Sequence, residues 1–539
     1  MLPTIPDDLA WRRLDSSETP LVQTSADDVL RVSSDALRLL AREAFRDVNF
    51  LLRPSRLAQI AGILTSPEAS GGDRMVAQMA LENAALAARM ELPLCQDTGT
   101  ATVFGWKGGG IVTPGRDAEH LEAGIRETYA AGNLRHSVMV AASTFEESNS
   151  RSNLPASIRL QAVDGGAYRF LFAAKGGGSA NKTRLFQESP AMLRRDRMLP
   201  FLEAKMRALG TSACPPYRIA VAVGGLSPEE TLEAAKLLSC GALDGLPDAS
   251  ELDGALGHSG AFRDGELERE LLARTRTFGI GAQLPGRFFA LDVRAVRLPR
   301  HSASLPIGLA VSCLADRQVW GRIDRTGVWL EELERHPERF LPKAGEEIGS
   351  TASGSGEPPV EVDLSQPMDR IRRSLAGLPV GTMLSLTGEL VVARDLAHAR
   401  IRRIIESGGT PPREFFEHPI YYAGPAGTPP GHPCGSFGPT TARRMDADLR
   451  FFQEHGAALV TLAKGDRGPE VRSSCRDNGG FYLGTVGGTA ALVADRCITS
   501  SRVAAFPELG MEAVFLIHVR RLPAFVIVND RGDDLYGGC

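Results

Sequence analysis

The pattern of apolar and polar residues predicts helices and strands that follow one another along the chain. After Ser33, apolar residues recur with the spacing of one helix face as far as Leu51, and Pro54 is expected to stop this helix. The apolar run 217–223 precedes two glycines and the sequence Ser-Pro-Glu-Glu at 227–230, which is typical of a helix start. This second segment is expected to fold as strand, turn and helix.

Further short apolar runs predict strands in both halves of the chain. In the C-terminal part they alternate with a helical pattern over residues 441–455, which favours a layered α/β arrangement. The expected fold class is therefore α/β in the broad, mixed α+β sense. The runs are 294–298 and 307–312 around a turn at 299–302, then 383–386, 388–393, 458–462 and 524–528.

The composition changes abruptly over residues 342–359, PKAGEEIGSTASGSGEPP, where Gly, Ser, Pro and Glu dominate and Ile348 is the one large apolar residue. Such a stretch is typical of a linker. It divides the chain into a larger N-terminal domain, 1–341, and a smaller C-terminal domain, 360–539. Both are long enough to bury a core.

Composition and charge narrow the possible functions. Hydrophobic residues make up 43% and charged residues 23% of the 539 residues, as in folded globular proteins. With 61 basic and 65 acidic residues, the chain has no excess positive charge to hold nucleic acid or an anionic membrane. No signal-like or membrane-spanning apolar run is present, so a cytoplasmic location is expected. Eight scattered cysteines indicate thiols or metal ligands in a reducing compartment.

Two glycine-containing polar clusters are candidates for binding chemistry. CQDTGT at 95–100 places a cysteine beside an amide, a carboxylate and two hydroxyls, although a polar turn with an incidental cysteine is as good an interpretation. KGGGSANKT at 175–183 fails the P-loop pattern because Asn181 stands where glycine is required. A backbone nest for a carboxylate and a plain glycine-rich turn both remain open.

Polar residues in the C-terminal part could bind an anion. GSFGPTTARR at 435–444 leads into a helix start, where free N–H groups favour anions, although Thr440 or Thr441 could equally be an ordinary helix cap. Arg394 and Lys464 follow strand-like runs, and ligands gather at the carboxyl ends of strands in open α/β sheets. A single cation in such a place is usually solvated. The spacing of the cysteines matches neither zinc sites nor ferredoxins, and any one of them could be a small buried apolar residue.

Together these clusters resemble class I fumarases, the iron-sulfur fumarate hydratases, along nearly the whole chain. The motifs that carry the resemblance are LPLCQDTGTA, AAKGGGSANKT, GTSACPPY, RLPRHSAS and AVSCLADR in the N-terminal part, and HPIYYAGPA, GPTTARRMD and GGFYLGTVGG in the C-terminal part.

The resemblance implies a 4Fe-4S cluster held by Cys95, Cys214 and Cys313, with one iron left without a protein ligand. That iron would act as a Lewis acid on the substrate hydroxyl. The resemblance also implies reversible hydration of fumarate to (S)-malate. The implied substrate site comprises Gln96, Asp97, Arg135, Gly178, His301, Arg394, Thr440, Thr441, Arg444 and Lys464.

This set suits a small dicarboxylate, because arginine and lysine side chains can bind both carboxylates. Family analogy makes Thr440 the base that removes the C–H proton, which requires nearby cations to stabilise its alkoxide. Asp97, working with His301, would protonate the departing hydroxide. Family analogy also implies a homodimer.

Several alternatives accompany this reading. Tartrate dehydration or mesaconate hydration can use the same architecture, because a pocket discriminates weakly against one extra methyl or hydroxyl. A nucleotide-binding phosphotransferase is disfavoured by the failed P-loop, and a non-catalytic iron or redox sensor would not need the cationic residues. Leu305 stands where a non-ligand cysteine can occur. Cys434 and Arg443 depart from the family pattern beside the GPTT loop.

Overall fold

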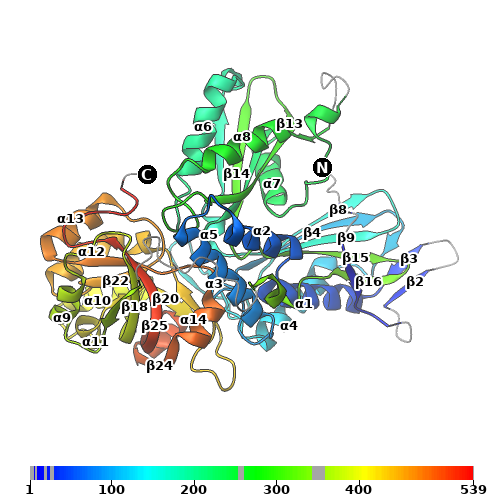
Figure 1. Ribbon diagram of the computed structural model, residues 1–539. Coiled ribbons are helices and arrows are strands. Elements are labelled where there is room, and N and C mark those ends of the chain that lie inside the picture. The colour runs from blue at the N-terminus through cyan, green and yellow to red at the C-terminus, as the bar shows by residue number, and fades with distance from the viewer. Residues whose placement is uncertain are drawn as a thin grey trace.

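The computed structural model describes residues 5–6, 9–16, 21–24, 29–252, 260–342 and 358–537. Three larger sheets, each with helices packed against it, form three lobes around the central helices α2 (Pro54–Thr65) and α3 (Gly71–Ala87) (Figure 1). The expected mixed α/β fold class is confirmed.

The first lobe is a six-stranded sheet packed against two N-terminal helices. Helix α1 (Ser34–Phe50) begins where the sequence predicts, and the Ser33 side chain accepts a hydrogen bond from the Ala36 N–H. Pro54 does not end α1, which stops at Phe50, but begins α2. The sheet order is β1 (Trp11–Arg13), β16 (Gly327–Glu331), β15 (Gln318–Asp324), β9 (Tyr168–Lys175), β4 (Thr100–Gly108) and β8 (Ser157–Val163), with α1 and α4 (Asp117–Ala131) alongside.

The second lobe contains the predicted strand-turn-helix unit. Ser227 caps α7 by accepting a hydrogen bond from the Glu230 N–H, as its sequence indicates. The strands on either side of turn 299–302 are longer than predicted, and β11 separates them in the sheet. The order is β10 (Arg184–Glu188), β14 (Leu305–Ser312), β11 (Tyr217–Gly225), β13 (Ala290–Arg300) and β12 (Phe262–Arg263), with helices α6 (Arg195–Arg207), α7 (Pro228–Ser239) and α8 (Gly265–Thr275).

The third lobe is the C-terminal layered α/β region. Its predicted runs 383–386 and 388–393 form one strand, bent at Gly388, whose φ is +129°. The sheet order is β17 (Val360–Asp363), β18 (Met383–Val392), β19 (Ile420–Tyr421), β22 (Val460–Ala463), β23 (Phe481–Gly484), β25 (Val514–Val528) and β24 (Ile498–Ala505). Its helices are α9 (Met368–Leu375), α10 (Asp395–Glu406), α11 (Glu414–Glu417), α12 (Asp446–Glu454), α13 (Pro469–Asn478) and α14 (Ala490–Arg496).

Short elements complete the described fold. They are β2 (Val22–Thr24), β3 (Leu30–Val32), β5 (Ile111–Val112), β6 (Met139–Ala141), β7 (Glu147–Asn149), α5 (Gly177–Ala180), β20 (Ala423–Pro425) and β21 (Phe437–Pro439).

One hydrophobic core joins the N-terminal helices α2 and α3 to the C-terminal sheet. Buried Asn83, on α3, links them further: its amide nitrogen donates to the carbonyl of Leu94, at 3.0 Å, and its amide oxygen accepts the N–H of Leu492, at 3.0 Å. Because Leu94 directly precedes Cys95, the core fixes the first cysteine loop against the C-terminal lobe.

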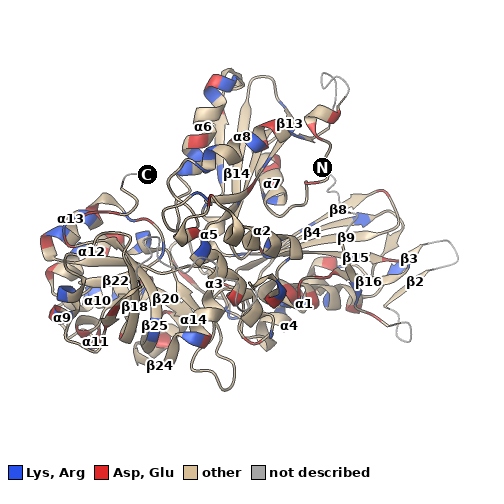
Figure 2. Ribbon diagram, viewed as in Figure 1, with Lys and Arg blue, Asp and Glu red and all other residues tan. Residues whose placement is uncertain are grey.

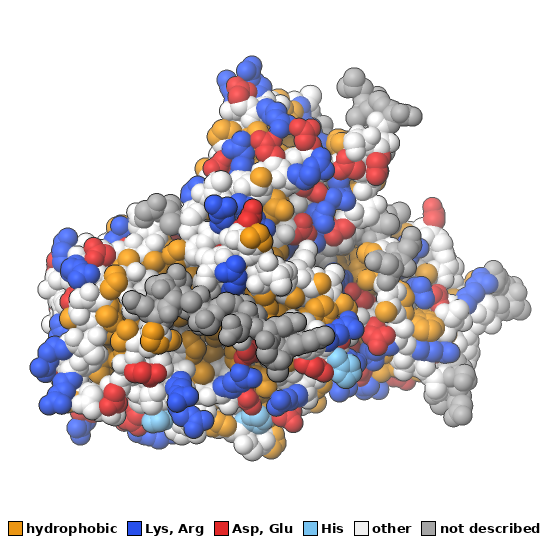
Figure 3. All heavy atoms as spheres, in the orientation of Figure 1, with side chains coloured by type: hydrophobic (Ala, Val, Ile, Leu, Met, Phe, Trp, Pro, Cys, Tyr) orange, Lys and Arg blue, Asp and Glu red, His pale blue; other side chains and the backbone are white. Residues whose placement is uncertain are grey.

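The structure can be compared with the expectations for the linker, for membrane-spanning segments and for the surface charge. Residues 343–357 of the predicted linker lie outside the described residues. No described helix is both long enough and apolar enough to cross a bilayer. Basic and acidic side chains are interspersed over the elements and over the face shown (Figures 2 and 3), so neither sign of charge dominates there.

Candidate active site

Cys214 and Cys313 lie on neighbouring loops at one end of the second sheet. Cys214 precedes β11 and Cys313 follows β14, and the Leu314 N–H donates to the Cys214 carbonyl at 3.0 Å. Buried Arg56 donates from one guanidinium nitrogen to the carbonyls of Pro216, at 2.9 Å, and Cys313, at 3.1 Å. Cys214 adopts a left-handed backbone conformation, φ +62°, which is strained for a non-glycine residue. Hydrogen bonds around both cysteines therefore fix the positions of their loops.

Lys464 connects these cysteines to the C-terminal lobe. It directly follows β22, and its Nζ donates to Cys214 Sγ at 2.9 Å. Burial would lower the pKa of Lys464, but the sulfur groups of Cys214, Cys95 and Cys313 outweigh it and raise the pKa. Burial also raises the pKa of the Cys95 thiol to about 11, against the opposing charges of Arg317 and Lys464. The half-buried Lys464 ammonium thus contacts Cys214 and lies within electrostatic range of Cys95 and Cys313.

The three cysteines are not arranged as the ligands of a single metal ion. Among the described residues, no three His, Cys, Asp or Glu side chains converge closely enough to hold one metal ion. In an iron-sulfur cluster each cysteine binds a different iron, so the sulfur atoms need not converge. Gly487 leaves space beside Cys214, because a Cβ there would lie 2.4 Å from its Sγ.

The Asp97 carboxylate contacts the glycine-rich loop 175–183, which favours the carboxylate-binding interpretation of that loop. The Gly177 N–H donates to Asp97 Oδ2 at 2.8 Å, so the loop does bind a carboxylate, one that the chain itself supplies. A side chain at Gly176 would collide with this carboxylate. Burial would raise the pKa of Asp97, but the charges of Arg135 and Arg317 and the Gly177 hydrogen bond lower it. Asp97 is therefore a half-buried, ionised carboxylate.

Gln96 and Gly178 lie where separate loops meet. The Gln96 amide donates to the Pro439 carbonyl at 2.9 Å, directly before Thr440. Gly178 faces the backbone of Ala213, 3.5 Å from the position of an added Cβ. These contacts place both residues between the cysteine loops and the GPTT loop.

The two threonines of the GPTT loop have different partners. Arg444 Nη2 donates to Thr440 Oγ1 at 2.6 Å, and its guanidinium also lies 3.0 Å from Asp395. Thr441 occupies the N-cap position of a short helical turn, but its side chain makes no capping hydrogen bond and donates instead to the Ser212 carbonyl at 3.3 Å. The ordinary-cap interpretation is therefore wrong for Thr441.

Arginines gather on the C-terminal side of the site. Arg394 is 2% exposed, and burial together with the charge of Arg135 lowers its pKa to about 9. Glu512 lies 2.8 Å from its Nε, and the charge of Arg444 opposes that of Arg394 as well. The charges of Arg135 and Arg444 both act on Arg394, so an anionic ligand would stabilise this cationic pocket.

His301 does not join these residues within one chain. It lies in an exposed loop between β13 and β14, and its Nδ1 accepts the Ala303 N–H at 3.2 Å. Cys313 follows the other end of β14, and that eight-residue strand spans roughly 23 Å at about 3.3 Å per residue. The strand therefore separates His301 from the cysteines.

Arg317 belongs to the site but was not predicted from the sequence. It is 3% exposed, and its charge acts on both Asp97 and Cys95. Its position in AVSCLADR, four residues after Cys313, is the signal that could have identified it. The two residues that depart from the family pattern, Cys434 and Arg443, make none of the contacts described above. Burial raises the pKa of Cys434 to about 12, and Arg443 is exposed and pairs with Asp466 at 3.6 Å.

The site combines three cysteines, a half-buried carboxylate and several arginines, a set of side chains that suits an enzyme for small anionic substrates. A family model described as fumarate hydratase (fumerase) matches residues 38–322, and one described as fumarase C-terminus matches residues 327–538. The chain belongs to the class I fumarate hydratases, a hydro-lyase family, which confirms the resemblance seen in its motifs.

Relatives match over almost the full length. The chain is 46% identical over 530 residues to the anaerobic class I fumarate hydratase of Escherichia coli strain K12, covering 98% of this chain and 95% of that protein. It is 47% identical over 515 residues to fumarate hydratase 2 of Leishmania major, covering 96% and 89%. Two Methanocaldococcus jannaschii chains, provisionally named as the beta and alpha subunits of L(+)-tartrate dehydratase, are 32% and 29% identical and cover 31% and 45% of this chain.

Proposed function

We propose that this protein catalyses the reversible hydration of fumarate to (S)-malate with a 4Fe-4S cluster bound by Cys95, Cys214 and Cys313. The observation that carries the proposal is the position of Lys464. Its ammonium contacts Cys214 Sγ at 2.9 Å, while its backbone N–H donates to the Thr440 carbonyl at 3.2 Å. One residue thus joins the cysteine donors to the threonine and arginine pocket.

The chemistry of the donors supports a cluster at this place. The half-buried Lys464 ammonium contacts Cys214 and acts electrostatically on Cys95 and Cys313, so it would stabilise their thiolates. When bound, the cluster would supply an open iron position as a Lewis acid for the substrate hydroxyl.

Arginines and Lys464 supply the charge that a dicarboxylate requires. Arg135 and Arg444 both repel Arg394, so binding a carboxylate beside Arg394 would relieve this repulsion. Guanidinium groups can bind each carboxylate through two parallel hydrogen bonds. We propose that they orient fumarate, with Gln96, Gly178 and Thr441 fixing the backbone around it.

The proton transfers are assigned to Thr440 and Asp97. In hydration, the Thr440 hydroxyl would deliver the proton to carbon, and the hydrogen bond from Arg444 at 2.6 Å would stabilise the alkoxide left behind. The ionised Asp97 carboxylate would accept the proton of the attacking water, and in dehydration it would return that proton to the departing hydroxide.

A part for His301 in this proton transfer requires a second copy of the chain, because the length of β14 separates it from the cysteines of its own chain. This requirement links the proposed role of His301 to the proposed homodimer. We further propose that residues 1–341 form the cluster-binding domain and residues 360–539 the substrate-binding domain. The protein is proposed to work in the cytoplasm, where unpaired cysteines stay reduced.

Fumarate is preferred over tartrate as the proposed substrate because the fumarate hydratases match nearly the whole chain, whereas the tartrate dehydratase subunits match parts of it. Mesaconate remains the alternative, since it differs from fumarate by one methyl group.

The test is an anaerobic assay of purified protein with fumarate, mesaconate and tartrate. Fumarate is expected to have the highest kcat/KM, and Thr440→Ala should lower kcat by about 10²- to 10⁴-fold, the usual contribution of a proton-transfer residue. Thr499→Ala, on exposed β24, is the matched control and should behave as the unsubstituted protein. Turnover of tartrate alone would overturn fumarate as the proposed substrate. Near-normal turnover by Thr440→Ala would overturn the proton-transfer role of Thr440.

A further inference from the structure

A carboxylate of the chain itself lies beside Arg394. Glu512 Oε1 lies 2.8 Å from Arg394 Nε, and Arg394 Nη2 donates to the Met511 carbonyl at 2.6 Å. Both partners belong to the short helical turns Pro507–Glu512, which lie between β24 and β25. We call residues 506–512 the Glu512 loop. This loop occupies the edge of the guanidinium that is formed by Nε and Nη2.

A second edge of the guanidinium, formed by Nη1 and Nη2, remains available to a ligand. Among the described residues, Arg394 Nη1 donates no hydrogen bond and Nη2 donates to the Met511 carbonyl. One face of the group lies against Gly424 of β20, where an added Cβ would come within 2.8 Å of Arg394 Cζ. Gly424 and the Glu512 loop therefore fix the guanidinium in an orientation whose second edge can bind a carboxylate through two hydrogen bonds.

Arg394 lies among charges of both signs. Burial and the charges of Arg135 and Arg444 lower its pKa to about 9, and Glu512 has the largest opposing effect, ahead of Asp395. Arg394 Nε and Glu512 Oε2 are both buried without a hydrogen-bond partner among the described residues, so charge and not an aligned hydrogen bond holds this pair. A ligand carboxylate would therefore share the charge of Arg394 with Glu512.

We propose that Glu512 acts through Arg394 to limit the affinity of the site for carboxylates. Fumarate and malate each carry two carboxylates, so a site that held both very tightly would release its product slowly. Met511 and Gly424 would still hold Arg394 in a Glu512→Gln protein, so the change of charge should outweigh any loss of orientation. The inference rests on the proposed role of Arg394 in binding a substrate carboxylate.

The test measures binding of succinate, a saturated dicarboxylate that cannot be hydrated, to the anaerobically purified full chain by isothermal titration calorimetry. Glu512→Gln keeps the shape of the side chain and removes its charge. Two carboxylates on the two edges of one guanidinium repel each other across about 7 Å, so Glu512→Gln should bind succinate about 10- to 100-fold more tightly at an effective dielectric constant of about 20. KM for fumarate should fall over the same range, whereas kcat should not rise, because substrate and transition state are both bound more tightly.

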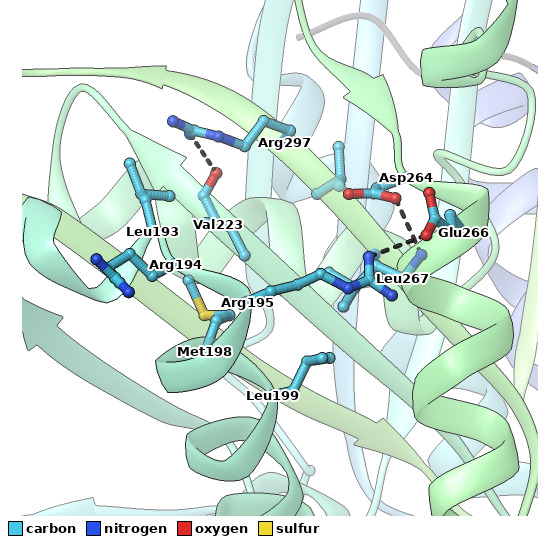
Figure 4. A pocket seen from close by; sticks show the side chains of 12 residues that line it. Leu193, Arg194, Arg195, Met198, Leu199, Val223, Asp264, Glu266, Leu267 and Arg297 are labelled. Atoms are coloured by element: carbon cyan, nitrogen blue, oxygen red, sulfur yellow. Dashed lines mark hydrogen bonds and ion pairs between the residues drawn. The ribbon is translucent and has the colours of Figure 1, made fainter.

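Glu266→Gln is the matched control, because it removes the same charge from another pair of arginine and glutamate. Glu266 lies on α8 and pairs with Arg195 at 2.9 Å beside the cavity between α6 and α8 in the second lobe (Figure 4). Its succinate affinity and its KM should stay within about twofold of the parent values, since this pair is exposed and screened by salt. Glu512→Asp, which keeps the charge, should restore most of the parent affinity.

Thermal unfolding separates this role from a merely structural one. Glu512→Gln leaves buried Arg394 with less compensating charge, so this variant should unfold at a lower temperature than the parent. The same concentration of succinate should raise the unfolding temperature of Glu512→Gln more than that of the parent, because a ligand stabilises the protein that binds it more tightly by the larger amount. A purely structural role of Glu512 predicts equal increases.

The outcomes for this inference and for the proposed reaction are distinct. Unchanged, weaker or undetectable succinate binding by folded Glu512→Gln would overturn the inference, even if the parent protein hydrates fumarate. Tighter succinate binding by Glu512→Gln would support the inference, even if the parent protein does not hydrate fumarate.

Discussion

Replacing Gly487 with alanine probes the cluster pocket with a single methyl group. A Cβ at this position would lie 2.4 Å from Cys214 Sγ and 2.8 Å from Lys464 Cδ, whereas ordinary contacts begin at 3.4 Å. The sulfur must therefore move by about 1 Å (3.4 − 2.4). Gly487 does not have a positive φ, so the substitution tests space and not backbone strain.

The expected effect follows from this displacement. A misplacement of about 1 Å at a catalytic centre can cost about 100-fold in rate, and overpacking a well-packed site costs about 1–3 kcal/mol of stability. We therefore expect kcat/KM for fumarate hydration to fall about 100-fold in Gly487→Ala, with iron and sulfide content reduced and the far-UV circular dichroism spectrum preserved.

The matched control is Gly62→Ala, because Gly62 lies within α2 and a Cβ there meets nothing within 4 Å. It should keep full activity and gain up to about 1 kcal/mol in stability from the better helix propensity of alanine. If Gly487→Ala retains its iron and the kcat/KM of the parent protein within twofold, the placement of Cys214 and Lys464 around the cluster is wrong.

Three further predictions use other parts of the site and core. Arg444→Met should lower kcat/KM by about 10- to 100-fold, because it removes a charged hydrogen bond to Thr440. Arg443→Met changes the exposed neighbour, and its kcat/KM should stay within about threefold of the parent value. Steady-state kinetics at one pH compares the two variants directly. Burial lowers the pKa of His398 to about 4 from the ordinary 6.5, so the unfolded chain binds the proton first as the pH falls. Urea unfolding should therefore show that, between pH 7 and pH 4, the free energy of unfolding of the parent protein falls by up to about 3 kcal/mol relative to that of His398→Phe. A difference between the two proteins that stays constant across this range would refute a neutral buried imidazole. Asn83→Ala leaves buried backbone groups of two lobes without partners and should lower the free energy of unfolding by about 2–4 kcal/mol, whereas a loss below about 0.5 kcal/mol would show that the lobes do not depend on this amide.

Local signals in the sequence were sufficient for the elements that they govern. Ser33 and Ser227 cap helices where predicted, because a cap depends on residues three positions away. Pro54 does not stop a helix, because proline equally suits the first turn of a helix, which is its place in α2.

Site features that depend on strand order could not be predicted in this way. The chain order gives no hint that β11 separates the strands flanking His301, nor that β14 keeps that residue away from Cys313. Likewise, the carboxylate that the glycine-rich loop binds belongs to Asp97, which lies far from Gly177 in the sequence. Only the packed structure brings Asp97 and the loop together. The motif AVSCLADR places Arg317 near Cys313 in the chain, but only the packed structure shows that Arg317 is buried and acts on Asp97 and Cys95.

The central claim is that a cluster held by Cys95, Cys214 and Cys313 and the adjoining cationic pocket together hydrate fumarate. The most direct measurement is fumarate hydration by anaerobically purified protein, with iron and sulfide assayed in the same samples before and after exposure to air. Hydration activity that rises and falls with iron and sulfide content, and that is lost in Cys214→Ser, is the predicted result. A metal-free, air-stable preparation with full activity would contradict it.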